Sequence, residues 1–216
     1  MNTKIVSLLT AFGLCFNAAT ADNSARIGYA SDYFYRGVQK AEESIQASLM
    51  LNQALGSLNG SLHVCSNQAV DTGNDSYHMG AGVGTSFADG LLSAYAGINH
   101  FEDVPGSSLI EAEISVSIDT LLSPSVTIFR DLDESLYTYE LGVSHVLETQ
   151  VADLSVNASY GNTETSPSSD TEYYVLGVSA SKSLSETASL GGSIDYVDAD
   201  NTNDEFVFGV GLTFNF

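Results

Sequence analysis

Apolar residues alternate with polar or small residues along most of this chain. The pattern is clearest in 205–216, where one face of an extended strand carries Phe206, Phe208, Val210, Leu212, Phe214 and Phe216. Successive side chains of a strand point to opposite faces, so a period of two predicts β-strands with one apolar face. Segments of this kind recur at 26–38, 45–52, 58–65, 77–87, 91–101, 110–118, 122–131, 137–144, 152–160, 173–180, 190–196 and 205–216.

These twelve segments favour a membrane barrel over a soluble β-sandwich. Their length is close to the roughly 9–11 residues of a tilted transmembrane strand, whereas sandwich strands are usually about 5–6 residues long. In lipid every backbone N–H and C=O must be paired, so an open sheet with bare edges is excluded. We therefore predict an all-β fold, a transmembrane antiparallel up-and-down β-barrel of about 12 strands.

Composition excludes two other classes of protein. The chain has 6 Lys and Arg against 27 Asp and Glu, a formal charge of −21, which argues against a nucleic-acid binder. Apolar residues make up 44% of the chain, which argues against disorder. The two cysteines, Cys15 and Cys65, do not form a disulfide framework.

The first 21 residues have the features of a secretory signal peptide. Lys4 supplies a positive charge, 5–16 is mostly apolar, and Ala19-Thr20-Ala21 is a cleavage site of the A-x-A type. We therefore divide the chain into a signal peptide, 1–21, and an outer-membrane barrel, 22–216. An exported barrel of this kind is expected in the outer membrane of a Gram-negative cell.

The expected connections differ in length and charge. If both termini face the periplasm, the outer loops are 39–44, 66–76, 101–108, 131–136, 161–172 and 198–204, and the inner turns are 55–58, 87–91, 119–122, 148–150 and 184–187. Longer outer loops are typical of outer-membrane barrels. The outer loops are acidic, and two clusters could bind Ca²⁺: Asp131, Asp133 and Glu134, and Asp198, Asp200 and Asp204. Neither has the spacing of an EF-hand, so we favour a solvated surface.

Three sequence features resemble the TorF-type porin family of small outer-membrane proteins. They are Ser31-Asp32-Tyr33-Phe34-Tyr35-Arg36-Gly37, the pair Ser66-Asn67, and the terminal Gly211-Leu212-Thr213-Phe214-Asn215-Phe216. The first is similar to an S-D-Y-x-x-R-G stretch in the first strand of that family, although the family's usual serine at position 39 is Gln39 here. The resemblance implies a porin, and its terminal Phe216 is similar to the signal read by the barrel assembly machinery.

The inward-facing charges are the candidate pore-lining residues. They are Asp32, Arg36, Glu111, Glu113, Glu140, Asp153 and Asp195. On a continuous first strand, Asp32 and Arg36 would lie about 13 Å apart, too far to pair, so each is expected to pair across strands. The charges could form a structural salt-bridge network or a selectivity constriction. Inward glycines, such as Gly80 and Gly177, could leave open space or mark curvature.

We predict a small channel for passive diffusion of small solutes that prefers cations, because carboxylates in a lumen and around its mouth favour them.

One alternative is a closed barrel that acts as a structural or surface-interaction protein through its acidic loops. Another is a lipid-modifying enzyme, for which His100 with Ser107 or Ser108 is the nearest candidate pair. The soft-metal pair His63 and Cys65 lacks further ligands. We assign no catalytic, cofactor-binding or metal-binding residue, and expect lipid, lipopolysaccharide and small solutes or cations as partners.

Overall fold

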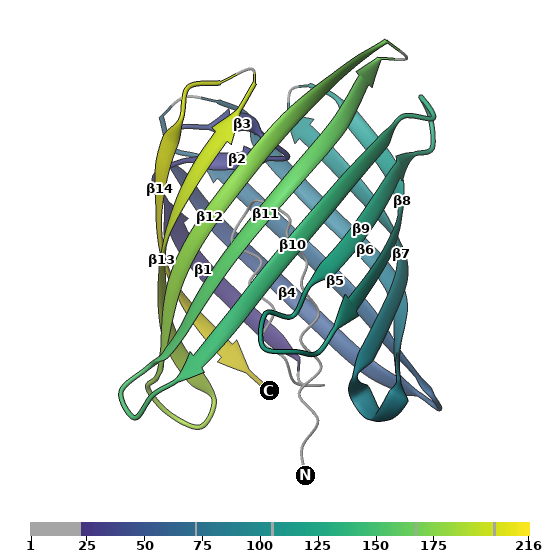
Figure 1. The fold of residues 1–216 in the computed structure, drawn as a ribbon. Coiled ribbons are helices and arrows are strands. Elements are labelled where there is room, and N and C mark those ends of the chain that lie inside the picture. The colour runs from purple at the N-terminus through teal and green to yellow at the C-terminus, as the bar shows by residue number, and fades with distance from the viewer. Residues whose placement is uncertain (1–22, 72, 105, 167, 201) are drawn as a thin grey trace.

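The computed structural model describes residues 23–71, 73–104, 106–166, 168–200 and 202–216, so the predicted signal peptide lies outside the described residues. The described chain forms a closed antiparallel barrel of twelve strands (Figure 1). These are β1 (Ser24–Ala30), β4 (Ser44–Leu55), β5 (Leu58–Ala69), β6 (Asp75–Phe87), β7 (Leu92–Val104), β8 (Ser108–Ile118), β9 (Ser125–Asp131), β10 (Tyr137–Glu148), β11 (Asp153–Ser166), β12 (Ser169–Ser183), β13 (Ala188–Ala199) and β14 (Glu205–Asn215). The predicted fold class is confirmed.

Pairing between β1 and β14 closes the barrel. Ser24 pairs with Asn215 on one side and with Met50 of β4 on the other, so neither edge of β1 is bare. Every other barrel strand pairs with its neighbours along the chain. The start of β1 and the end of β14 therefore lie at the same end of the barrel, here called the terminal end, and the opposite end is called the loop end.

Side chains alternate between an apolar outer face and a polar inner face, as predicted. On β8, Ile114 points outward with 60% of its surface exposed, while Glu111 and Glu113 point inward with 1% exposed. The other barrel strands likewise present exposed aliphatic and aromatic residues on the outside. No helix within the described ranges is long and apolar enough to cross a membrane. The apolar outer face and the polar inner face are those of a transmembrane barrel.

The first strand is shorter than predicted. We expected one strand over 26–38, but β1 ends at Ala30 and the chain then leaves the barrel wall. It forms a small hairpin of β2 (Tyr33–Tyr35) and β3 (Val38–Ala41) before β4 begins at Ser44. Figure 1 shows this hairpin across the barrel at the loop end, inside the ring of strands.

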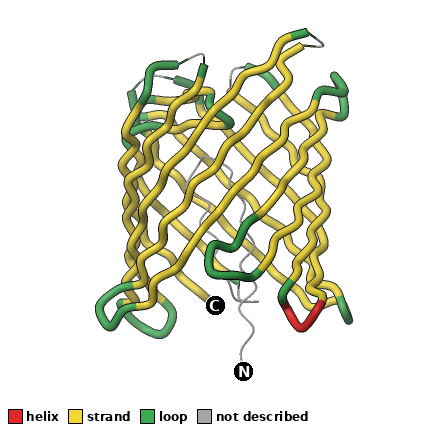
Figure 2. Tube along the Cα trace, viewed as in Figure 1, coloured by secondary structure: helices red, strands yellow, loops and turns green. Residues whose placement is uncertain are grey.

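The connections do not differ in length as predicted, apart from this first one. Between the described barrel strands, the loop end has connections at 70–74, 105–107, 132–136, 167–168 and 200–204, and the terminal end has them at 56–57, 88–91, 119–124, 149–152 and 184–187. Both sets are short, as Figure 2 shows, and the connection at 88–91 contains the 3₁₀ turn η1 (Ala88–Gly90). The reason is that the strands extend further: β11 and β12 occupy most of the predicted loop 161–172.

The hairpin turns tightly at two residues with left-handed backbone. Arg36 has φ of +50° and Gly37 has φ of +75°, the pattern of a type I′ turn. A Cβ atom at Gly37 would lie 2.8 Å from Cβ of Tyr173 on β12, so the turn lies directly against the far wall. Glycine is needed there both for its backbone angles and for this close approach.

Aromatic residues of the hairpin pack against opposite parts of the wall. Phe34 is 2% exposed and contacts Val197 of β13 and Val207 of β14. Tyr33 and Tyr35, on the other side, form a buried cluster with Phe101 of β7. The hairpin is therefore held from several directions inside the barrel at the loop end.

Inward glycines accommodate large neighbours, which neither of our two interpretations anticipated. A Cβ atom at Gly161 would collide with the ring of Tyr173, its register partner on β12. A Cβ atom at Gly82 would collide with the ring of Tyr95. The space left by these glycines is therefore occupied by an adjacent aromatic ring and is not open.

The lipid-facing position of Ile114 makes a prediction about stability. Ile114→Lys should lower the free energy of unfolding by about 2–4 kcal/mol, because it places a charge at mid-depth in the bilayer. Ile118→Lys is the matched control: it lies on the same face at the end of β8 and should cost about 0–1 kcal/mol. Urea titrations of both variants in lipid vesicles, followed by tyrosine fluorescence, measure the difference. Equal losses at the two positions would contradict this depth assignment.

Candidate functional site

Four of the predicted pore-lining residues meet inside the barrel. Glu111 and Glu113 lie two residues apart on β8, Glu140 lies on β10, and Arg36 lies at the tip of the hairpin. All four are buried, at 7% exposure for Arg36 and between 1% and 3% for the acids. Strand alternation explains why the three carboxylates point inward, and the hairpin turn explains how one cation reaches them. This group is called the lumen charge cluster.

Arg36 binds Glu111 through two parallel hydrogen bonds. Nη1 donates to Oε2 at 2.6 Å and Nη2 donates to Oε1 at 2.5 Å. The guanidinium also lies over the ring of Phe129 on β9, 3.8 Å from its centroid. A bidentate ion pair with an aromatic platform is a strong and directional arrangement for a buried arginine.

The ionised state of Arg36 follows from its neighbours. Burial disfavours the charged guanidinium, but Tyr35 and Glu111 outweigh this effect and raise the pKa of Arg36 above its ordinary value. Arg36 is therefore a permanent cation inside the lumen. Arg36 neutralises one of the three carboxylates, so the lumen charge cluster keeps an excess of acidic groups.

Asn99 of β7 connects Glu111 with Glu113. Its Nδ2 atom donates to Oε2 of Glu113 at 2.9 Å and approaches Oε1 of Glu111 at 3.5 Å. Oε1 of Glu113 and Oδ1 of Asn99 are buried without a hydrogen-bond partner in the described chain. The second carboxylate of β8 is thus held on one side and has an unused acceptor on the other.

Glu140 is held by a tyrosine of β12. The hydroxyl of Tyr173 donates a hydrogen bond to Oε1 of Glu140. The register explains this contact, because Glu140 pairs with Gly161 and Gly161 pairs with Tyr173, so the tyrosine reaches across the glycine to the acid. The three acids therefore have three different neighbours: an arginine, an asparagine and a tyrosine.

A row of rings joins the hairpin to β5 and β6. Tyr35 packs on Phe101 with centroids 4.0 Å apart, and Phe101 stacks on His78 at 3.9 Å. The Nε2 atoms of His78 and His63 lie 3.2 Å apart. His63 therefore contacts a second histidine. Cys65, the other residue of the soft-metal pair considered above, lies opposite His78 in the strand register. Among the described residues, no group of three or more His, Cys, Asp and Glu side chains is placed to hold a metal ion.

The remaining predicted pore-lining residues lie outside the lumen charge cluster. Asp32 is in the connection before the hairpin and accepts hydrogen bonds from Ser31 and Gln39, so the prediction that it shares a strand with Arg36 is wrong. The reason is that the chain leaves the wall after Ala30. Asp153 begins β11 and is exposed at the terminal end. Asp195 is on β13, where a Cβ atom at Gly177 would collide with its carboxylate.

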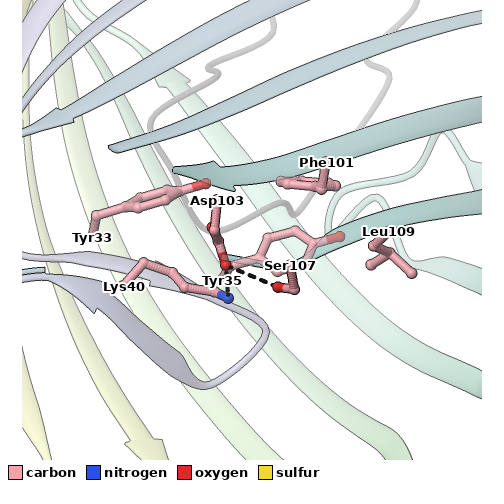
Figure 3. Close-up of a pocket in the computed structure, with 7 residues that line it drawn as sticks. All are labelled: Tyr33, Tyr35, Lys40, Phe101, Asp103, Ser107 and Leu109. Atoms are coloured by element: carbon pink, nitrogen blue, oxygen red, sulfur yellow. Dashed lines mark hydrogen bonds and ion pairs between the residues drawn. The ribbon is translucent and has the colours of Figure 1, made fainter. Parts of the chain in front are cut away.

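A small cavity of about 60 Å³ lies between the hairpin and the wall (Figure 3). It is lined by Tyr33, Tyr35, Lys40, Phe101, Asp103, Ser107 and Leu109. Lys40 forms an ion pair with Asp103 at 2.9 Å, and Ser107 donates to the same carboxylate at 3.3 Å. A space of this size holds a few water molecules. The space between hairpin and β7 is therefore small and is bridged by an ion pair.

The acidic connections at the loop end bind their own backbone and side chains. Oδ1 of Asp131 accepts hydrogen bonds from the amides of Asp133 and Glu134. Asp200 accepts from the amide of Glu172, and Asp204 accepts from the hydroxyl of Tyr196. These carboxylates thus have hydrogen-bond partners within the chain, and the solvated-surface interpretation of both clusters stays a prediction.

The structure brings together the histidine and serine that we considered for an enzyme. Nε2 of His100 lies 3.0 Å from Oγ of Ser108, and both are on the outer face near the loop end. In the described part of the chain, no carboxylate forms a hydrogen bond with His100. A serine nucleophile requires a histidine that is itself oriented by a third group. The pair therefore lacks one part of a hydrolase site.

Sequence reasoning missed the residues that organise the acids. Phe129, Asn99 and Tyr173 were not singled out, and each contacts a member of the lumen charge cluster. One signal was available for the hairpin: three consecutive aromatic residues, 33–35, break the period of two, and all three are buried. Nothing comparable in the sequence indicates the contacts of Asn99 or Tyr173, which depend on register.

Comparisons with known proteins support the fold. No protein-family model matches the chain, and no curated protein matches it either. Among solved structures, the KdgM porin is similar, with TM-score 0.61 and 9% identity, over 89% of this chain and 99% of that one. The COG4313 outer membrane channel from Pseudomonas putida F1 has TM-score 0.61 and 10% identity, over 97% and 99%.

LpxR from Salmonella typhimurium is also similar, with TM-score 0.53 and 13% identity, over 89% of this chain and 100% of that one. Identities this low are informative about the fold and not about residues of the site. The chain thus shares a closed barrel fold with small outer-membrane porins and channels.

Proposed function

We propose that this protein is an outer-membrane channel for passive diffusion of small solutes, with a preference for cations. The observation that carries the proposal is the lumen charge cluster: three carboxylates and one arginine inside a closed barrel of twelve strands. One of the three carboxylates holds the hairpin through Arg36, and the other two lie in the same interior, where Asn99 and Tyr173 donate hydrogen bonds to them. Charges in a lumen are the means by which channels discriminate between ions.

Barrel size is compatible with a narrow pore. Eight strands leave an interior filled by side chains, and sixteen to eighteen leave an aqueous channel. Twelve strands fall between these limits, and here the hairpin further reduces the opening at the loop end. We infer that conduction depends on the space that the hairpin leaves or on its displacement, so small ions are the expected solutes.

Cation preference follows from the excess of acid. Arg36 neutralises Glu111, while Glu113 and Glu140 have neutral hydrogen-bonding neighbours. The acidic connections at the loop end add a negative potential around the mouth, which raises the local concentration of cations. We also propose that the signal peptide exports the chain to the outer membrane and that the barrel assembly machinery recognises Phe216. Lipid and lipopolysaccharide would then surround the barrel, and the resemblance to the TorF-type porins agrees with this location.

The packed hairpin favours one alternative function. Because Phe34, Tyr33 and Tyr35 are buried on opposite sides of the lumen, a barrel that stays closed and acts through its acidic connections is the second candidate. The experiment that decides is single-channel recording of the refolded mature chain in a planar bilayer under a KCl gradient. Discrete steps with a cation-selective reversal potential support the channel. A silent bilayer, with a heat-modifiable gel shift that proves folding, supports the closed barrel.

The lumen charge cluster predicts which acids set selectivity. Glu113→Gln should move the reversal potential toward zero, because it removes an acid that has no cationic partner in the described chain. Glu111→Gln should move it further, because Arg36 then keeps its charge without a counterion. Asp153→Asn, exposed at the terminal end, is the control and should have the smallest effect. An unchanged reversal potential in both glutamate variants would reject these residues as the filter.

The hairpin makes a separate prediction about conductance. Ala30 and Ser44 are register partners, so an Asn-Gly turn can replace 31–43 without moving β1 or β4. This variant should conduct several times more current per channel, because the lumen loses its internal obstruction. The matched control replaces 149–152, an uncharged connection at the terminal end, with Asn-Gly between the partners Glu148 and Asp153 and should conduct as the wild type does. Equal conductance of all three proteins would mean that the hairpin does not limit the pore.

A further inference from the structure

Among the described residues, the contacts of the Arg36 guanidinium come from the wall of the barrel, apart from that of the adjacent Tyr35. Glu111 contributes two acceptor atoms, at 2.6 and 2.5 Å, and Phe129 contributes a ring 3.8 Å below. Tyr35 of the hairpin is more distant, with its centroid 4.8 Å from the guanidinium carbon. Glu111 and Phe129 belong to β8 and β9, so the backbone that carries both side chains is part of the barrel wall. The hairpin adds one hydrogen bond to the same carboxylate, from the hydroxyl of Tyr35 to Oε1 of Glu111 at 3.4 Å.

The chemistry of this wall selects one kind of cation. Two parallel acceptors on one carboxylate match the planar fork of a guanidinium and not the compact head of an ammonium. An aromatic face under the plane adds attraction for a flat, weakly hydrated cation. The unpartnered Oε1 of Glu113, linked to Glu111 through Asn99, offers a further acceptor beside the same site.

Arg36 is not the residue that its own turn prefers. The first position of a type I′ turn has positive φ and favours Asn, Asp or Gly, because a larger side chain is strained there. Arg36 adopts φ of +50° all the same. Its presence is therefore explained by the contacts of its side chain and not by the backbone that carries it.

We propose that Glu111 and Phe129 form a binding site for guanidinium-bearing solutes, and that Arg36 is a tethered occupant of this site. The inference rests on the proposed function, because a solute reaches the site through the channel. In the wild-type chain such a solute competes with a group at high effective concentration, so its apparent affinity is low. Removal of the Arg36 side chain makes the full affinity measurable.

Arg36→Gly is the variant of choice. Glycine adopts positive φ without strain, so the turn is kept while the guanidinium is lost. Arg36→Asn is the second variant, because Asn followed by Gly37 is a preferred type I′ sequence. The matched control is the double variant Arg36→Gly with Glu111→Gln, which keeps the shape of the site and removes its charge.

The first measurement is binding to the full chain folded in detergent. Guanidinium chloride, at millimolar concentrations far below those that denature, is compared with equal KCl by the temperature at which the heat-modifiable band is lost. The ion should stabilise Arg36→Gly, and the double variant should need at least about ten times more for the same shift, because two charge-assisted hydrogen bonds are weakened. The wild type should not respond in this range.

Equal responses of the single and double variants, or no response of either, would overturn the proposal. If both Arg36 variants fold only when guanidinium is added, the site is supported. If neither folds at any concentration of the ion, the free ion does not replace the tethered one and the site is rejected.

A bilayer recording separates this inference from the proposed function. Guanidinium should reduce the K⁺ current of Arg36→Gly and leave that of the double variant unchanged at the same concentration. A variant that binds the ion in detergent but never conducts would contradict the channel and keep the site. A variant that conducts but is indifferent to guanidinium in both assays would contradict the site and keep the channel.

Discussion

Closure of the sheet is the constraint on which the other features of this structure depend. A barrel wall in lipid must pair every backbone group, and β1 does so by binding β14 on one edge and β4 on the other. Closure then gives each strand an outer and an inner face. Because the outer face contacts lipid and is apolar, the polar residues of every strand point into one shared interior. The polar character of the lumen therefore follows from the apolar outer face that the lipid requires.

A polar interior of twelve strands also has to be filled or hydrated, and here much of it is filled. Tyr173 extends over Gly161, Tyr95 extends over Gly82, and the hairpin crosses the remaining space at the loop end. At these two positions the inward glycine accommodates a neighbouring ring and does not leave open space. The packing of the interior therefore depends on the first connection of the chain as well as on the number of strands.

The wall of the barrel could be predicted from the sequence, while the hairpin could not. Period-two alternation is a local property, so the strand that carries Ile114 and Glu113 was recognisable from its own residues, as was the final strand. The hairpin is different, because the only local sign of it is the break in alternation at 33–35, which does not indicate where the chain goes next. Its inward path is determined by contacts with β7, β8, β12 and β13, which lie far away in the chain. The pairing of Arg36 with Glu111 spans 75 residues, so no local pattern indicates it.

The same distinction applies to the acids of the lumen charge cluster. Glu111, Glu113 and Glu140 were all predicted to point inward, but the sequence does not separate their roles. In the structure Glu111 is committed to the hairpin, and Glu140 is held by Tyr173. Glu113 alone among the three has a buried oxygen without a partner in the described chain. Three similar residues at similar depth thus differ in how far the chain occupies their carboxyl oxygens, and that difference depends on register and on the hairpin, not on residue type.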